Sequence, residues 1–179
     1  LEQLSADDVL KTVKAIYNAK RVFLLARGLS EQVAQEFALK LQVLGLYVFA
    51  NYDPIIMQTI AKQLKNGDVV IIFSMSGATH ELIRAAENAS SLGVRIICVT
   101  CGDRDVPLTK LASLTLYGHR HSHRSFKGAD VASRLPLFVI SRVIVDYLAL
   151  YCEEQREKEL AKERAHAKRH YFTGHDYEP

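Results

Sequence analysis

The chain has few of the residues that mark several common classes of protein. Its 179 residues include no tryptophan, four prolines and only three cysteines. An odd and sparse set of cysteines argues against a disulfide scaffold and fits a reducing compartment. Its uninterrupted apolar runs reach about six residues, far short of the roughly 20 that cross a membrane. We therefore expect a soluble cytoplasmic protein without a membrane partner.

Charge and cysteine spacing exclude two further classes. The 23 basic and 20 acidic side chains leave a net charge of +3, too small to predict nucleic-acid binding by this segment. Cys98 and Cys101 have a C-x-x-C spacing, but they lie at the end of an expected strand. There, residues three apart face opposite sides, about 10 Å apart, which disfavours a redox or zinc pair. We expect no metal and no cofactor.

Apolar segments alternate with helical patterns along the chain. Strands are expected at 21–26, 46–50, 68–73, 94–100 and 113–117, and helices at about 30–44, 54–64 and 79–92, after an amphipathic helix near residues 7–17. Apolar strands joined by helices predict an α/β fold: a single doubly wound five-stranded parallel sheet with helices on both faces, a flavodoxin-like three-layer sandwich. Ligands of such sheets bind beyond the carboxyl ends of the strands.

The segment Ser74-Met75-Ser76-Gly77-Ala78-Thr79 directly follows the apolar run at 69–73. Gly77 allows the backbone to approach an anion closely, and the following helix offers unpaired N–H groups. The hydroxyls of Ser74, Ser76 and Thr79 can donate to separate phosphate oxygens, and N–H groups around Met75 can assist. The alternative is an ordinary helix start with Thr79 as its cap.

This segment resembles the Ser-x-Ser-Gly-x-Thr loop of the sugar-isomerase (SIS) domain, which binds phosphosugars. The resemblance extends over roughly residues 8 to 150. It includes Ala26-Arg27-Gly28-Leu29-Ser30, where the family has Gly-x-Gly-x-Ser, and the pair Ser133-Arg134. Ala26 departs from that pattern. The resemblance implies a phosphate held by Ser30, Ser74, Ser76 and Thr79 with the backbone of Met75 and Gly77, and a sugar read by Arg27, Gly28, His119, Lys127 and Arg134.

The loop at 118–128 and the segments after it complete the organisation. His119, His121 and His123 could share one face, but no nearby Cys or Glu supports a metal site. The helix expected at 129–152 is apolar on more than one side, with Pro136 in an early turn or at a kink. The resemblance implies a homodimer or higher homo-oligomer, and this helix is our candidate contact. We divide the chain into a binding domain at 1–152 and a charged helical tail at 153–179.

A binding function is favoured over catalysis. Isomerases with this domain supply a Glu from its later half, whereas no Glu lies between Glu87 and Glu153. The only carboxylates in the loops of that interval are Asp103, Asp105 and Asp130. The chain is most similar to the effector domain of RpiR-type bacterial transcriptional regulators of carbohydrate metabolism. That resemblance implies a hexose or N-acetyl amino-sugar phosphate as effector, and a preceding helix-turn-helix domain, outside this chain, that binds DNA. An aldose–ketose phosphosugar isomerase and a structural module with an empty site are the alternatives.

Overall fold

The structure, a computed structural model, describes residues 4–119 and 132–173, with side chains described as far as residue 164. Its sheet contains five strands in the order β2-β1-β3-β4-β5, and every pair is parallel. The strands are β1 (Arg21–Ala26), β2 (Val48–Asn51), β3 (Asp68–Ser74), β4 (Arg95–Thr100) and β5 (Leu114–Tyr117). The predicted α/β class and the five-stranded parallel sheet are confirmed.

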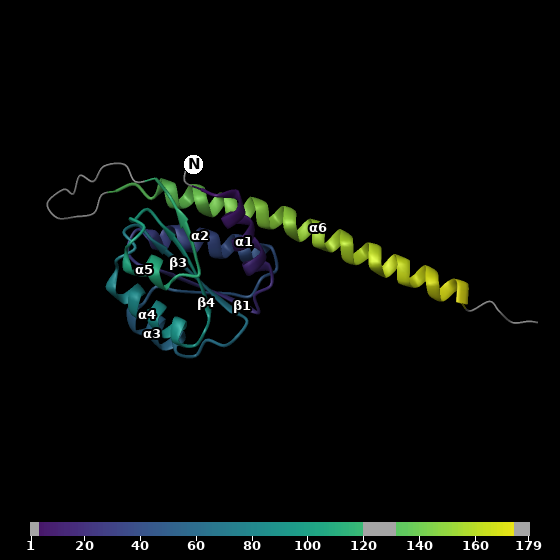
Figure 1. The fold of residues 1–179 in the computed structure, drawn as a ribbon, viewed down its shortest axis with the longest axis horizontal. Coiled ribbons are helices and arrows are strands. Elements are labelled where there is room, and N and C mark those ends of the chain that lie inside the picture. Colours follow the sequence, from purple (N-terminus) through teal and green to yellow (C-terminus); the bar gives the residue numbers. More distant parts are fainter. Residues whose placement is uncertain (1–3, 120–131, 174–179) are drawn as a thin grey trace, which may run out of the picture.

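Helices cover both faces of this sheet (Figure 1). One face packs against α1 (Ala6–Tyr17), α2 (Ser30–Val43) and α6 (Leu135–Thr173), and the other against α3 (Pro54–Ala61), α4 (His80–Ser91) and α5 (Pro107–Leu111). Side chains alternate between the two cores along each strand, so that Leu24 and Ile71 belong to the first and Phe23 and Val70 to the second. The fold is thus a three-layer sandwich.

Local sequence signals explain where the helices begin. The Ser5 hydroxyl accepts a hydrogen bond from the N–H of Asp8 at the start of α1. The Asp53 carboxylate accepts from the N–H groups of Ile55 and Ile56 at the start of α3, with Pro54 as the first helical residue. Such caps satisfy N–H groups that have no partner within the helix, and proline suits the first turn.

Several element boundaries differ from those expected. Strand β2 spans Val48–Asn51 instead of 46–50, and α6 begins at Leu135 instead of 129. The predicted helix at 54–64 ends at Ala61, and the short helix α5 was not predicted. The segments expected as a core helix and a separate charged helix form one helix of 39 residues, so the division at residue 152 falls inside it. No Gly or Pro follows Pro136 within α6, so nothing in the local sequence ends the helix at residue 152. Pro136 lies in the first turn, as one of the two expectations had it.

By length and composition alone, α6 could cross a membrane over residues 135–164. The core helix of a soluble protein passes the same test, and α6 packs against α1 and α2. Its inner face buries Leu137, Ile140, Ile144 and Leu148 in the core. A helix that places one side in a protein core has the amphipathic character of a globular protein. Its length and composition therefore do not indicate a membrane protein.

Candidate functional site

The site predicted from sequence lies at the point where the strand order reverses. Strand β1 has β2 on one side and β3 on the other, so the turns that follow β1 and β3 lead to helices on opposite faces of the sheet. Ala26 is paired with Phe73 at the ends of these strands, and therefore Arg27 and Ser74 follow side by side. Open parallel sheets bind ligands in the crevice that forms at such a point.

The turn after β3 is organised by two of its own hydroxyls. Ser74 is the last residue of β3 and is 2% exposed, and its Oγ accepts a hydrogen bond of 3.1 Å from the N–H of Gly77. The Oγ of Ser76 accepts from the N–H of Ala78 at 3.2 Å. A hydroxyl that accepts in this way still has its own hydrogen to donate. These bonds fix both oxygens at the turn and leave both O–H groups able to meet an anion.

Thr79 occupies the N-cap position of α4, but its side chain makes no capping hydrogen bond. Its backbone is extended there, with φ −71° and ψ 118°, and the residue is half-buried. The ordinary helix-start interpretation requires the Thr79 hydroxyl to accept from an N–H of the first turn. The structure lacks that bond, so capping does not explain the threonine. The amino end of α4 also contributes the positive end of the helix dipole.

Close packing explains the glycine of the turn. Gly77 has φ +66°, and a Cβ added there would lie 2.4 Å from Cγ2 of Val106. A Cβ on Gly102 would lie 2.3 Å from the backbone oxygen of Ser76. The N–H of Leu108 donates to the Gly77 oxygen at 3.1 Å. The segment after β4 therefore supports the turn from outside. Space restricts both positions to glycine, and at Gly77 the positive φ does so as well.

The turn after β1 carries the second group of predicted residues. Ser30 is the first residue of α2 and is 2% exposed. Gly28 has φ +58°, and its N–H donates to Oε1 of Glu31 at 2.9 Å. Ala26 is the last residue of β1 and fully buried, so the turn proper starts after it and obtains its positive φ from Gly28. The departure from the family pattern at Ala26 thus leaves the turn intact.

Arg27 is held by protein groups in this turn. Its Nη1 donates to the backbone oxygen of Tyr52 at 2.8 Å and lies 3.5 Å from Oε1 of Glu31. Burial, followed by the nearby Glu31 carboxylate, raises the pKa of Tyr52 above its ordinary value. Glu31 and Tyr52 were not predicted as members of this cluster. The carboxylate lies in the first turn of α2, and the tyrosine follows β2, a strand far from Arg27 in the sequence. The Glu31 carboxylate offsets part of the Arg27 charge.

Of the later predicted residues, the structure describes His119 and Arg134, and both lie at the same edge of the sheet. His119 is exposed after β5, and Arg134 is half-buried just before α6. A Cβ on Gly118 would lie 2.9 Å from Cβ of Pro136, so the start of α6 lies against the end of β5. Lys127, together with His121, His123 and Asp130, lies outside the described residues.

A further residue of the site was missed from sequence. Thr100 ends β4, is fully buried, and accepts a hydrogen bond of 2.9 Å from the N–H of Gly102. A Cβ on Gly77 would lie 3.2 Å from the Thr100 oxygen. The available sequence signal for this residue was a threonine at a strand end, followed two positions later by a glycine. Thr100 therefore supports the turn through the neighbouring strand.

The cysteines do not form a pair. Cys98 packs in the core beside α3 and α4, whereas Cys101 packs in the core beside α2 and α6. Burial raises the pKa of the Cys98 thiol to about 12, so it stays protonated at neutral pH. Within residues 4–119 and the described part of α6, no three His, Cys, Asp or Glu side chains come together in a way that could hold a metal ion.

Fold and site together define a doubly wound α/β domain with a hydroxyl-lined turn at its switch point. The SIS domain family model matches residues 15–139, and the chain belongs to this family.

Regulators are prominent among the relatives. The chain is 27% identical over 161 residues to an uncharacterized HTH-type transcriptional regulator of Clostridium perfringens, covering 89% of this chain and 57% of that protein. Thus the chain spans little more than half the length of this relative. The Vibrio vulnificus NanR protein complexed with ManNAc-6P has a similar fold (TM-score 0.79, 22% identity, 90% of this chain and 61% of that chain). The sugar isomerase domain of an RpiR transcription factor from Sphaerobacter thermophilus also has a similar fold, with a TM-score of 0.77 and 19% identity. The match covers 92% of this chain and 89% of that chain.

Proposed function

We propose that this chain is the effector-sensing domain of a transcriptional regulator and that it binds a phosphorylated sugar. The observation that carries the proposal is the turn at 74–79, in which two serine oxygens are fixed by backbone N–H groups while their O–H groups remain able to donate. Family membership and the regulators among the relatives support it. In this proposal, DNA is bound by another part of the full-length regulator.

The phosphate is assigned to both turns at the switch point. Ser74, Ser76 and Thr79 donate from one side, and Ser30 donates from the start of α2. Two helix amino ends therefore face one dianion, an arrangement that favours negative charge. The sugar extends toward Arg27 and, at the far side, toward Arg134. The complex of NanR with ManNAc-6P supports a hexose or N-acetylated amino-sugar phosphate as the effector class.

The test is a binding and turnover assay on a panel of hexose 6-phosphates and N-acetylated amino-sugar 6-phosphates. A cognate ligand at 100 times its dissociation constant should stabilise the fold by about 2.7 kcal/mol, measured as a thermal shift. Ser76→Ala should abolish that shift. The matched control is Ser90→Ala, on an exposed serine near the end of α4, which should keep it. Stabilisation of the Ser76 variant equal to that of the parent would reject the assignment.

The same panel tests the isomerase alternative. Proton transfer between sugar carbons needs a positioned base. In the described residues the loop carboxylates after β4 are Asp103 and Asp105, and no Glu follows until Glu153 in α6. We therefore expect binding without interconversion of aldose and ketose phosphates. Turnover of any panel member, followed by chromatography of the products, would replace the sensor with an enzyme.

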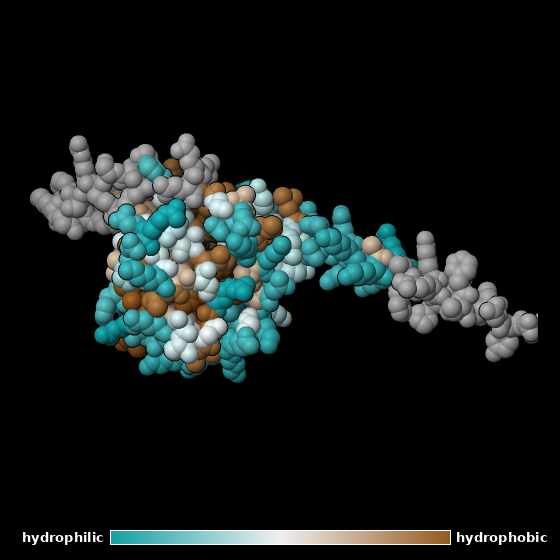
Figure 2. Space-filling view, viewed as in Figure 1, coloured by the Kyte–Doolittle hydropathy of each residue, from teal (hydrophilic) through white to brown (hydrophobic). Residues whose placement is uncertain are grey.

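We further propose that two copies pair through α6. Large apolar side chains remain exposed on this helix, and Figure 2 shows apolar surface where α6 crosses the body and hydrophilic surface along its distal part. The exposed residues are Leu135, Val139, Tyr147, Leu150 and Leu160. Sedimentation should give a dimer that Leu150→Glu converts to monomers. A parent chain that sediments as a monomer at all concentrations would contradict this pairing. The effector then acts by preferring one dimer arrangement.

A further inference from the structure

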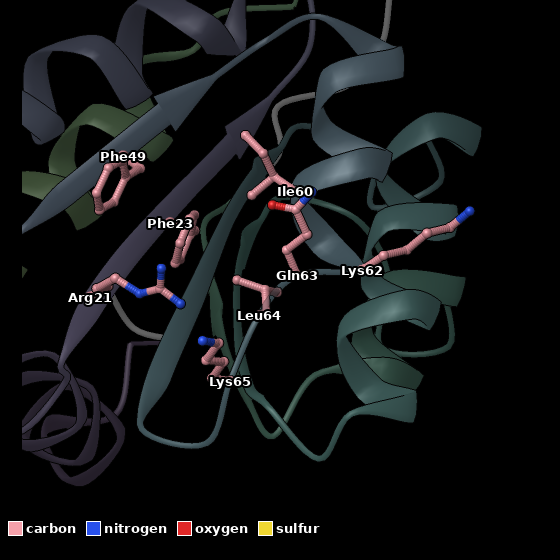
Figure 3. Close-up of a pocket in the computed structure, with 8 residues that line it drawn as sticks. All are labelled: Arg21, Phe23, Phe49, Ile60, Lys62, Gln63, Leu64 and Lys65. Atoms are coloured by element: carbon pink, nitrogen blue, oxygen red, sulfur yellow. The ribbon is translucent and has the colours of Figure 1, made fainter.

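A cavity of about 600 Å³ lies near the amino ends of the strands, away from the phosphosugar turns that follow their carboxyl ends. Its lining combines the early part of β1, the middle of β2, the last turn of α3 and the connection from α3 to β3 (Figure 3). The lining residues are Arg21, Phe23, Phe49, Ile60, Lys62, Gln63, Leu64 and Lys65. The cavity exists because α3 ends at Ala61 and leaves this part of the sheet uncovered. Its volume is in the range of small-molecule sites, about 300 to 1,000 Å³.

Two phenylalanines form one wall. Phe23 and Phe49 stack with ring centroids 5.2 Å apart and an angle of 18° between planes, and the Arg21 guanidinium lies 5.1 Å from the Phe23 centroid. Phe23 is 6% exposed, whereas Phe49 is 49% exposed. The Phe49 ring therefore offers aromatic surface that no helix covers. Leu64, which is 6% exposed, supplies an aliphatic wall opposite.

The lining holds three cations and no carboxylate. Arg21 is paired outside the lining with buried Asp68, at 2.9 and 2.6 Å, which fixes its guanidinium. The single Asp68 charge balances Arg21 alone. The Lys65 N–H and the Arg21 guanidinium both donate to Oδ2 of Asp68, and in Figure 3 the Lys62 side chain points away from the cavity. A second anion here would balance the charge of Lys65 next to the aromatic wall.

We propose that this cavity is a second ligand site, specific for a small molecule that joins a planar aromatic ring to an anionic group. The ring packs on Phe49 between the strands and Leu64, and the anion faces Lys65 and Arg21. Arg21 begins β1 and the cavity opens near the amino ends of the strands, whereas the phosphosugar turns follow their carboxyl ends. The two ligands therefore occupy separate sites at opposite ends of the strands.

The test uses anilinonaphthalene sulfonate, a planar aromatic anion, titrated by fluorescence into the whole chain. Saturation at one site per chain is expected. Phe49→Ala should weaken binding about tenfold because the stacking surface is lost. Lys65→Gln should weaken it up to about fivefold, the range of a solvent-exposed ion pair, and this loss should vanish in high salt.

Three controls decide the outcome. Tyr147→Ala removes an exposed aromatic ring from α6 and should leave probe affinity unchanged. Ser76→Ala should also leave it unchanged, so that failure of the phosphosugar assignment stays distinguishable from failure of this one. Circular dichroism checks that the Phe49 variant is folded, and Lys65→Gln tests the site without touching its packing. Equal affinity in the Phe49, Lys65 and parent proteins, or probe binding that follows self-association in sedimentation, would overturn the proposal.

Discussion

Replacing Gly77 by alanine tests the origin of the turn geometry. The residue has φ +66°, and an added Cβ would lie 2.4 Å from Cγ2 of Val106. The left-handed backbone costs an alanine roughly 1–2 kcal/mol, and the overlap adds about 1–3 kcal/mol if Val106 must move. A loss of about 2–5 kcal/mol in the free energy of unfolding is therefore expected. In a domain of this size that lowers the melting temperature by roughly 4–20 °C.

Gly93→Ala is the matched control for this substitution. Gly93 has φ +68°, nearly the same conformation, but nothing lies within 4 Å of its added Cβ. Urea unfolding should therefore show only the backbone cost, about 1–2 kcal/mol, in the control. The double variant Gly77→Ala with Val106→Ala should recover part of the excess loss. Equal destabilisation of the two glycine variants would refute the packing argument. Phosphosugar affinity should fall in the Gly77 variant alone.

Two further predictions concern buried ionisable groups. Burial alone would raise the pKa of Asp68, but hydrogen bonds from the Arg21 guanidinium and the Lys65 N–H outweigh it and hold that pKa below its ordinary value. The carboxylate therefore stabilises the fold above about pH 4, and this contribution is lost as the pH falls toward the lowered pKa. Asp68→Asn should cost about 1–3 kcal/mol in urea unfolding at pH 7 and less at pH 3, whereas a cost independent of pH would contradict the pairing. The second prediction compares two cysteines. Burial raises the pKa of Cys98 to about 12, whereas Cys152 is only half-buried. Brief iodoacetamide labelling of the native protein at pH 8 should modify Cys152 before Cys98, and mass spectrometry showing the reverse order would exclude this packing.

The fold could be predicted because its signals are local. Five apolar runs separated by helical patterns specify a parallel sheet, and Gly45 and Gly93 mark the ends of two helices. The limits of α3 were wrong because apolar residues continue to Leu64, beyond the point where the backbone leaves the helix. The single long α6 was missed because its composition changes from apolar to charged at Glu153, although the backbone has no reason to stop there.

The candidate site could be predicted only in part. Ser74, Ser76 and Gly77 are adjacent in sequence, so a local motif reveals them. Arg27 was expected to read a sugar, but its contact with the Tyr52 carbonyl depends on how β1 and β2 pair. Such contacts between distant segments have no signature in a single sequence. For the same reason the cavity beside Phe49 was not expected, since it depends on how far α3 covers the sheet.

The two serines of the turn after β3 should separate stability from binding. Removing the Ser74 hydroxyl leaves the buried N–H of Gly77 without its partner, at a cost of about 1–3 kcal/mol. Removing the Ser76 hydroxyl takes the acceptor from the N–H of Ala78. That hydrogen bond is exposed, so water replaces the lost acceptor at little cost. Urea unfolding should thus show a loss for Ser74→Ala and almost none for Ser76→Ala, while calorimetry should show lost phosphosugar binding in both. Destabilisation by the Ser76 variant as large as that by the Ser74 variant would mean that both hydroxyls serve the fold.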